Sequence, residues 1–207
     1  MSTIITSIDP DSPAMRAGLR AGQRLLTING HAVVDVLDYR FYGYDPVSHL
    51  TLKNEDGSTQ KLTVRKAEGE DLGLNFDTYL MDEMRSCANH CIFCFVDQMP
   101  PGMRQTLYFK DDDARLSFLQ GNYITLTNLT EREAQRIIDL RISPINVSVH
   151  TTDPQLHCTM LGNKNAAKSL DYIRAFCKAG IVMNGQIVVC PDWNDGDRLR
   201  RTLRDLT

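Results

Sequence analysis

Short apolar runs alternate with polar and turn-forming residues along the first part of the chain. Period-two alternation is typical of strands, whereas apolar residues three and four positions apart indicate helices. We expect strands at 4–8, 24–28, 49–53 and 59–65, and helices at 14–19 and 33–42. Asn29-Gly30 follows the second strand pattern, and this dipeptide is the strongest short signal for a hairpin turn. Residues 1–66 are therefore predicted to form a small α+β domain.

The pattern changes at 67–71, where apolar periodicity stops and charged residues gather, so we expect a linker there. Beyond it, strand patterns alternate with helix patterns. The expected strands are 72–76, 123–127, 145–150 and 186–190, and the expected helices follow Thr130, span 165–179 and close the chain at 200–207. Thr130 and Glu133 have the spacing of a capping box. This alternation predicts parallel βαβ units, so residues 72–207 are expected to form an α/β domain.

Composition narrows the class of protein. Hydrophobic residues make up 42% of the 207 residues, enough for a buried core, and the net charge is −3. That charge provides no basic surface, so we expect no nucleic-acid partner. No apolar run approaches the roughly 20 residues of a membrane span, and no secretory leader is visible. We therefore expect a cytoplasmic protein without a membrane partner, whose six cysteines are reduced thiols or metal ligands.

Three of those cysteines, Cys87, Cys91 and Cys94, lie within one stretch of eight residues with the spacing C-x3-C-x2-C. This spacing suits one loop that curls around a single inorganic centre. A 4Fe–4S cluster is usually held by four thiolates, so three would leave one iron open to a further ligand. A structural zinc site is the alternative, with His90 as the fourth ligand, although zinc modules usually use two separated pairs of ligands.

The same residues carry a resemblance. Cys87, Cys91 and Cys94, with aromatic Phe93 before the last cysteine, resemble the signature of the radical S-adenosylmethionine (radical SAM) superfamily. The resemblance implies a 4Fe–4S cluster whose open iron is chelated by S-adenosylmethionine, with Phe93 against the adenine. It further implies an electron donor such as a ferredoxin or flavodoxin, and reductive cleavage to methionine and a 5′-deoxyadenosyl radical. The substrate of that radical is not predicted by any residue of the sequence.

Further segments extend the resemblance over essentially the whole chain. Residues 95–104, 121–128 and 186–191 are similar to a bacterial family of uncharacterised iron–sulfur proteins, in which a PDZ-like domain precedes a radical SAM domain. Radical SAM domains typically form an open partial barrel of six strands. A complete eight-unit barrel uses about 30 residues per unit, so residues 72–207 have room for about four β/α units. We therefore expect a truncated partial barrel and interpret the chain as a fragment or a truncated product.

Ligands of α/β proteins collect at the carboxyl ends of the strands. Thr127 and Asn128 end the second strand of the α/β domain, where the resemblance implies contacts to the methionine part of S-adenosylmethionine. They stand in place of a Gly-Gly-Glu-type motif, and Asn128 fits equally well as a cap of the next helix. Ser148 and His150 share one face of the third strand because side chains alternate. With Gln186 on the fourth strand they are candidates for ribose or carboxylate contacts, although a lone histidine is more often structural.

The first domain also carries a resemblance. Its quoted segments are Ser12-Pro13-Ala14, Ala17-Gly18-Leu19, Ala21-Gly22-Gln23 and Ile28-Asn29-Gly30. They resemble bacterial PDZ domains, with Gln23 at a position that usually holds Asp. PDZ domains bind peptides by adding a strand to a sheet edge, which implies a protein or peptide partner. The usual backbone nest for a terminal carboxylate is missing before the first strand, so a packing module without a free peptide is the alternative.

The charged run and the three remaining cysteines are expected to have structural roles. The charged run 110–115 is expected to be a solvated connection. Cys158, Cys177 and Cys190 are not expected to hold a second cluster, and Cys177 is expected to pack as a small hydrophobic residue. For the whole chain, the alternative to a radical SAM enzyme is a non-catalytic PDZ-like interaction protein with an inactive, truncated barrel.

Overall fold

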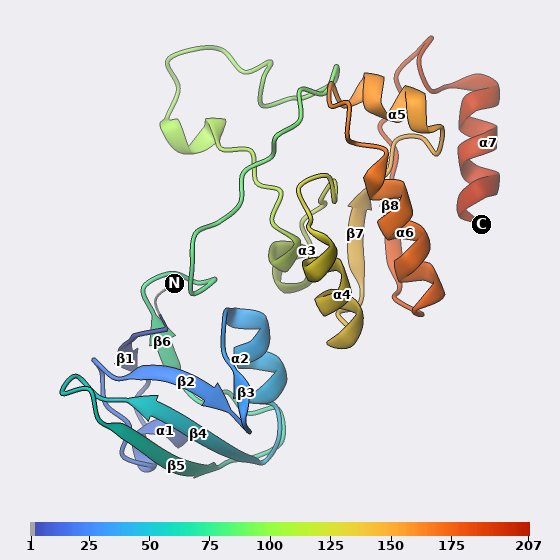
Figure 1. Cartoon of the computed structure of the whole chain (residues 1–207). Coiled ribbons are helices and arrows are strands. Elements are labelled where there is room, and N and C mark those ends of the chain that lie inside the picture. The colour runs from blue at the N-terminus through green and yellow to red at the C-terminus, as the bar shows by residue number, and fades with distance from the viewer. Residues whose placement is uncertain (1–2) are drawn as a thin grey trace. The chain divides into compact units, whose positions relative to one another are not determined.

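The computed structural model describes residues 3–207, and the chain divides after Met84 into two units (Figure 1). The first unit contains β1 (Ile5–Ile8), α1 (Pro13–Arg16), β2 (Arg24–Ile28), β3 (His31–Ala32), α2 (Val36–Tyr42), β4 (Val47–Lys53), β5 (Thr59–Arg65) and β6 (Leu74–Phe76). Strands β3, β2, β4 and β5 form one antiparallel sheet in this order, and β1 pairs with β6. Each helix and long strand predicted for 1–66 is thus present.

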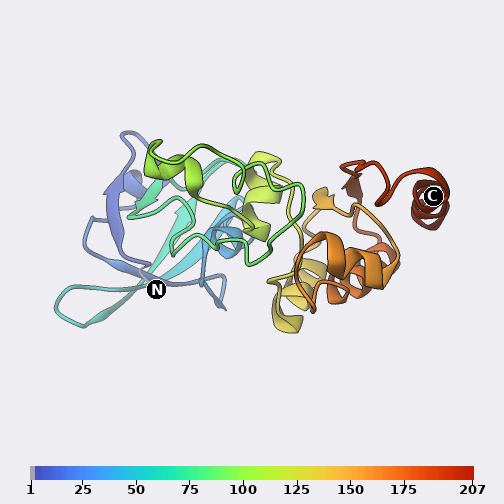
Figure 2. The same cartoon turned by 90° about the horizontal axis from the view of Figure 1, so that it is seen from above.

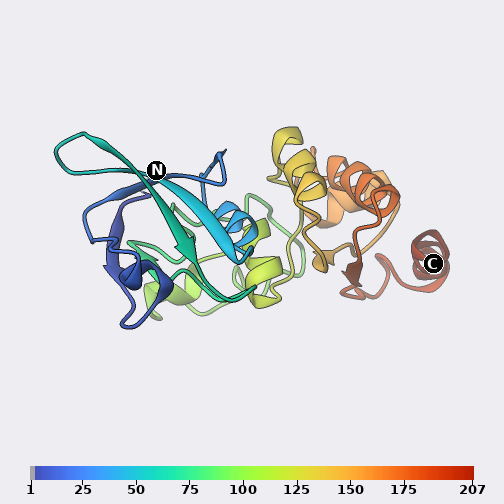
Figure 3. The same cartoon turned by 90° about the horizontal axis from the view of Figure 1, so that it is seen from below.

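Local signals explain why this unit folds as predicted. Asn29 and Gly30 have positive φ angles of 51° and 84°, and they close the hairpin between β2 and β3. Ser12 and Asp35 cap the two helices by accepting bonds from backbone N–H groups. The core of this unit includes five buried strand residues, Leu25, Ile28, Leu50, Leu52 and Val64. The hairpin of β4 and β5, in cyan to teal, is seen from below in Figure 3.

Strand β6 corrects one prediction. Residues 72–76 were expected to form the first strand of the second domain, but β6 pairs antiparallel with β1. The reason is that Leu72 and Leu74 are buried within the first unit, where Leu72 O accepts a bond from Ala14 N. Gly73 between them has a φ of 81°, and a Cβ there would collide with Ser12. The first unit therefore extends past the predicted linker at 67–71.

The second unit, residues 85–207, contains fewer strands and more helices. Its elements are the 3₁₀ helix η1 (Gln105–Tyr108), α3 (Ala114–Gln120), α4 (Glu131–Asp139), β7 (Ile145–Ser148), α5 (Pro154–Met160), α6 (Lys168–Lys178), β8 (Met183–Gln186) and α7 (Gly196–Leu206). Strands β7 and β8 are parallel, as predicted, and α5 and α6 lie between them in sequence. Figure 2 shows this unit from above, with α4 in yellow and α5 and α6 in orange.

Three predicted strands of this unit differ in extent, and the one predicted at 145–150 ends at Ser148. Residues 123–127 form a single parallel bridge, Ile124 with Val147, instead of a strand. The strand predicted at 186–190 lies at Met183–Gln186. It ends there because Val188 N bonds to a histidine ring and Cys190 N to an asparagine side chain instead of to β7. The protein is an α/β protein with parallel strands, while the four-unit partial barrel stays a prediction.

The charged run 110–115 is not a solvated connection. Asp112, Asp113 and Arg115 expose 2%, 1% and 7% of their surface. Asp113 caps α3 and binds the Arg115 guanidinium at 2.6 Å, and Asp112 accepts two bonds from Thr125. Buried charges need such partners, and the run supplies them within itself and from Thr125. Among the residues that the structure describes, no helix is long and apolar enough to cross a membrane.

Candidate metal and cofactor site

The cysteine loop is irregular and is held by backbone hydrogen bonds at its start and in its middle. Cys87 N donates to Lys110 O at 2.7 Å. His90 N donates to Leu161 O and Ile92 N to Met160 O, both at 2.9 Å. The loop is therefore fixed between the start of the charged run and the end of α5, without being part of a helix or strand.

The three thiols are half-buried, and Cys91 interacts electrostatically with both Cys87 and Cys94. Burial, followed by the neighbouring thiols of Cys87 and Cys94, raises the pKa of Cys91 to about 12. Burial also raises the pKa of Cys87. Within residues 3–207, no three His, Cys, Asp or Glu side chains are already gathered as a set of metal ligands. The donor set nevertheless fits a cluster, since coordination to a cation deprotonates thiols and removes this mutual repulsion.

Lys110 places a positive charge beside the loop. Its ammonium group lies 2.7 Å from an Asp97 carboxylate oxygen and donates to the Asn89 carbonyl oxygen at 3.2 Å. The hydrogen bond to Asp97 raises the pKa of Lys110, and the same bond lowers that of Asp97. A cation that stays charged next to three thiols favours their thiolate form.

Asn89 lies between the first two cysteines and is 1% exposed. Its side-chain amide bonds to Thr125, Thr127 and Asn163. The Thr127 hydroxyl, predicted to contact S-adenosylmethionine, is thus hydrogen-bonded to the cysteine loop. The assignment of Thr127 to the cofactor stays a prediction.

Asn128 also contacts the segments around the loop. Its amide nitrogen donates to Asp112 O at 3.1 Å and to Ser86 O at 3.4 Å. It does not cap the following helix, because Thr130 occupies the N-cap of α4 and forms the predicted capping box with Glu133. The alternative interpretation of Asn128 as a cap is therefore wrong, and its contact to a cofactor stays a prediction.

Phe93 and His150 form the second part of the candidate site. Their ring centroids are 4.5 Å apart, with planes at 59°. Burial, then the nearby His157, lowers the pKa of His150 to about 4, so this imidazole is neutral near pH 7. Its Nδ1 accepts a bond from Val188 N at 3.2 Å, which gives it a structural role as well. An aromatic residue of the cysteine loop thus contacts the last residue of the third predicted strand.

Ser148 and Gln186 are paired residues at the ends of β7 and β8, and their side-chain oxygens are 3.5 Å apart. Ser148 is buried and Gln186 is exposed. His150 does not continue the alternation of β7, because its φ of 57° lies in the left-handed region. The expectation that Ser148 and His150 share a strand face is therefore wrong, although both remain near the carboxyl end of β7.

The other cysteines divide into two kinds. Cys158 and Cys190 pack, with Cys91 and Phe93, against the buried cluster of Met160, Leu161 and Ala166. Cys177 is exposed on α6, so its predicted packing as a hydrophobic residue is wrong. Its exposure follows from the helix period, because the buried face of α6 is formed by Ser169, Leu170, Tyr172 and Phe176.

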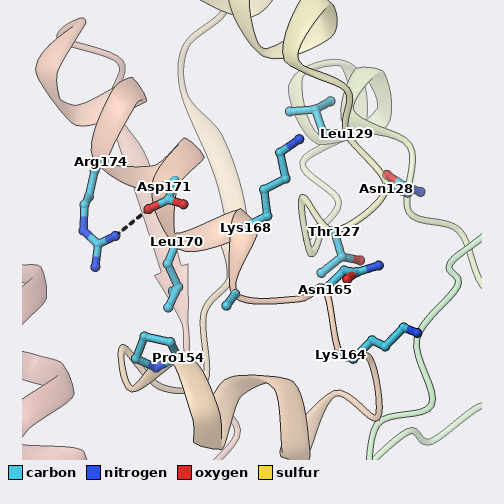
Figure 4. A pocket seen from close by; sticks show the side chains of 11 residues that line it. Thr127, Asn128, Leu129, Pro154, Lys164, Asn165, Lys168, Leu170, Asp171 and Arg174 are labelled. Carbon is cyan, nitrogen blue, oxygen red and sulfur yellow. Dashed lines mark hydrogen bonds and ion pairs between the residues drawn. The ribbon is translucent and has the colours of Figure 1, made fainter.

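A pocket of about 690 Å³ opens beside this site (Figure 4). It is lined by Thr127, Asn128, Leu129, Pro154, Lys164, Asn165, Ala167, Lys168, Leu170, Asp171 and Arg174. The dashed line in Figure 4 marks the ion pair of Arg174 with Asp171, at 2.7 Å. Two predicted cofactor residues, Thr127 and Asn128, therefore face a hollow lined by polar and charged groups. No periodic pattern in the sequence predicts this pocket, because its lining comes from three separate stretches of the chain, 127–129, 154 and 164–174.

The second unit is an α/β domain that carries the cysteine loop, and the first unit is built on an antiparallel sheet. A protein-family model described as a radical SAM-like domain matches residues 66–207, which is more than half of the chain. The chain therefore belongs to this family. The model of the PDZ domain matches residues 4–53, so the first unit contains a PDZ-like domain. Both findings confirm the resemblances drawn from the sequence. The comparison with curated proteins found no match.

Proposed function

We propose that the chain is a radical SAM iron–sulfur protein that binds a 4Fe–4S cluster through Cys87, Cys91 and Cys94. The observation that carries the proposal is the joint position of the three half-buried thiols on one anchored loop within the matched domain. The cluster, when bound, would supply one electron to S-adenosylmethionine and so yield methionine and a 5′-deoxyadenosyl radical. The protein would then be an enzyme, with no substrate assigned to it.

The remaining candidate residues would bind and orient S-adenosylmethionine. Phe93 would lie against the adenine, and Thr127 and Asn128 would contact the methionine part. Ser148, His150 and Gln186 would contact the ribose with their oxygen and nitrogen atoms. The neutral state of His150 supports this role, since an uncharged imidazole can accept or donate a hydrogen bond without adding charge beside a sulfonium.

The proposal includes the partners and the compartment. An electron donor such as a ferredoxin or flavodoxin would reduce the cluster, and a protein or peptide could add to the sheet of the PDZ-like domain. A reducing cytoplasm suits an iron–sulfur protein with exposed Cys177 and no disulfide among its described cysteines.

The test is the iron and acid-labile sulfide content after anaerobic reconstitution. We expect about four irons and four sulfides per wild-type chain. Cys91→Ala should lose the cluster, whereas Cys177→Ala, a matched substitution of an exposed cysteine, should retain it. Zinc without sulfide in the wild type would support the structural zinc site instead. An intact cluster in Cys91→Ala would overturn the assignment of the ligands.

A further inference from the structure

We propose that Asn89 is a positioning residue that fixes the cysteine loop relative to the segment carrying Thr127. The inference rests on the proposed function, because it assumes that Cys87 and Cys91 hold the cluster. Asn89 is the middle residue of the three that separate these cysteines. Backbone hydrogen bonds hold the loop at Cys87, His90 and Ile92, and the Asn89 side chain adds hydrogen bonds to the segment that carries Thr127.

Four hydrogen bonds saturate the Asn89 carboxamide. The amide nitrogen lies 3.1 Å from the Thr125 hydroxyl and 2.9 Å from the Thr127 hydroxyl. The amide oxygen accepts from Asn163 Nδ2 at 2.7 Å and lies 3.1 Å from the Thr127 hydroxyl. The side chain thus joins the loop to two other segments, one before α4 and one after α5.

The direction of these bonds follows from Asp112. Its carboxylate accepts one hydrogen bond from the Thr125 hydroxyl and one from Thr125 N, both at 2.6 Å. With its only proton committed to Asp112, the Thr125 hydroxyl can only accept further hydrogen bonds, so its 3.1 Å contact with the Asn89 carboxamide is a bond donated by the amide nitrogen. The amide oxygen of Asn89 must then face Asn163. Asp112 therefore sets the orientation of Asn89 through Thr125.

The consequence concerns the geometry of the site. Lys110 holds the Asn89 carbonyl oxygen, and the side chain holds Thr125 and Thr127, so both parts of Asn89 are fixed. The cysteine loop and the threonine segment are then one rigid unit. In the proposed enzyme, this unit sets the distance between the cluster ligands and the residues that orient S-adenosylmethionine. Removing the amide would take one hydrogen-bond partner each from Thr125, Thr127 and Asn163 and loosen the attachment of the loop.

The experiment compares Asn89→Ala with two matched controls in the full chain. Thr125→Val removes the hydroxyl at almost constant shape, while Thr125→Ser keeps it. Asn184→Ala removes an exposed amide that donates a hydrogen bond to Asn146. In metal-free protein, the rate of alkylation of Cys87, Cys91 and Cys94 by iodoacetamide is followed by peptide mass spectrometry. In reconstituted protein, the rate of iron release to a chelator is measured, together with the change in the electron paramagnetic resonance spectrum on adding S-adenosylmethionine.

We expect Asn89→Ala and Thr125→Val to increase alkylation and iron release on the order of tenfold, the loss expected for a buried hydrogen bond. The spectral change should need more S-adenosylmethionine in these two variants. Thr125→Ser and Asn184→Ala should behave as the wild type. Rates for Asn89→Ala and Thr125→Val within about twofold of the wild type would overturn the inference. If Asn89→Ala does not fold, the two Thr125 variants decide.

A failure of the proposed function is distinguishable from a failure of this inference. A wild type without iron and sulfide contradicts the cluster, and the alkylation rates of the metal-free protein still decide whether Asn89 holds the loop. A wild type with a cluster, combined with unchanged rates in the variants, contradicts only the role of Asn89.

Discussion

The two units of the chain are held in shape by different means. In the first unit, backbone ladders of β2, β4 and β5 set the positions of side chains, and turn residues set the register. In the second unit, the ladder is short. The cysteine loop is held by isolated backbone hydrogen bonds to other segments and by the side chains of an asparagine, two threonines and a buried aspartate. The comparison teaches that a regular scaffold is readable from periodicity, whereas a site on an irregular loop depends on contacts between distant residues.

The largest expected effect tests whether the units are independent. Leu52 in β4 and Phe176 in α6 are both fully buried. Truncating such residues leaves a cavity, so we expect Leu52→Ala and Phe176→Ala each to cost about 3 to 4 kcal/mol in the unfolding of their own unit. Trp193 is the only tryptophan of the chain and belongs to the second unit. Its fluorescence during denaturant unfolding therefore reports on that unit alone.

Phe176→Ala should lower the midpoint of the Trp193 transition, and Leu52→Ala should leave it unchanged. Far-UV circular dichroism, which reports on both units, should detect both losses. Equal shifts of the Trp193 transition in the two variants would mean that the units unfold together, and the comparison between them would then be wrong.

The sequence predicted the first unit well because its signals are local. Asn29-Gly30, the cap residues and period-two alternation each act within a few residues, and the structure confirms the elements they predict. The sequence misassigned 72–76 because the partner of β6 is β1, almost seventy residues earlier, and no local pattern records that pairing. The burial of Asp112 and Asp113 was missed for the same reason: a charged run looks solvated until its distant partner, Thr125, is known.

The candidate site was predicted in part. The three cysteines and Phe93 stand out because their spacing is local, and the family match supports them. Asn89, Asp112 and Lys110 did not stand out, since Asn89 occupies a spacer position and the other two belong to the charged run. The one available signal was that run itself: consecutive carboxylates next to lysine and arginine can be buried when they cap a helix and bind a side chain.

The next prediction concerns how the stability of the second unit depends on pH. The pKa of His150 is near 6.5 in the unfolded chain and about 4 in the folded protein. As the pH falls through this interval, the unfolded state binds a proton that the folded state does not, so the folded state loses stability. Relative to His150→Asn, the wild type should lose about 3 kcal/mol between pH 7.5 and 4. Asparagine tolerates the left-handed backbone of this position and can accept the bond from Val188 N.

The measurement is the free energy of unfolding from the Trp193 transition at several pH values, for both proteins. The opposite titration of Asp112, whose pKa burial raises to about 6, is present in both and cancels in the difference. Parallel pH profiles would mean that the His150 ring is not buried in a neutral state, and the contact with Phe93 would then need revision.

The smallest effect concerns two matched helix caps, one in each unit. Thr130 caps α4. Its hydroxyl accepts a hydrogen bond from Glu133 N at 3.3 Å, and the Glu133 carboxylate accepts one from Thr130 N at 2.9 Å. Burial alone would raise the pKa of Glu133, but the bonds from Arg85 and Thr130 outweigh it and lower the pKa to about 2. Ser12 caps α1 by accepting a bond from Met15 N at 3.2 Å.

Thr130→Ala should cost about 1 kcal/mol in the Trp193 transition, and Thr130→Ser less than half of that. Ser12→Ala should leave this transition unchanged, since its helix belongs to the first unit. The Thr130 variant has one further consequence, because Glu133 also binds Arg85, two residues before Cys87. A cap that only stabilises α4 would leave alkylation of Cys87 unchanged. Faster alkylation of Cys87 in Thr130→Ala would show that the cysteine loop depends on side-chain contacts as far away as α4.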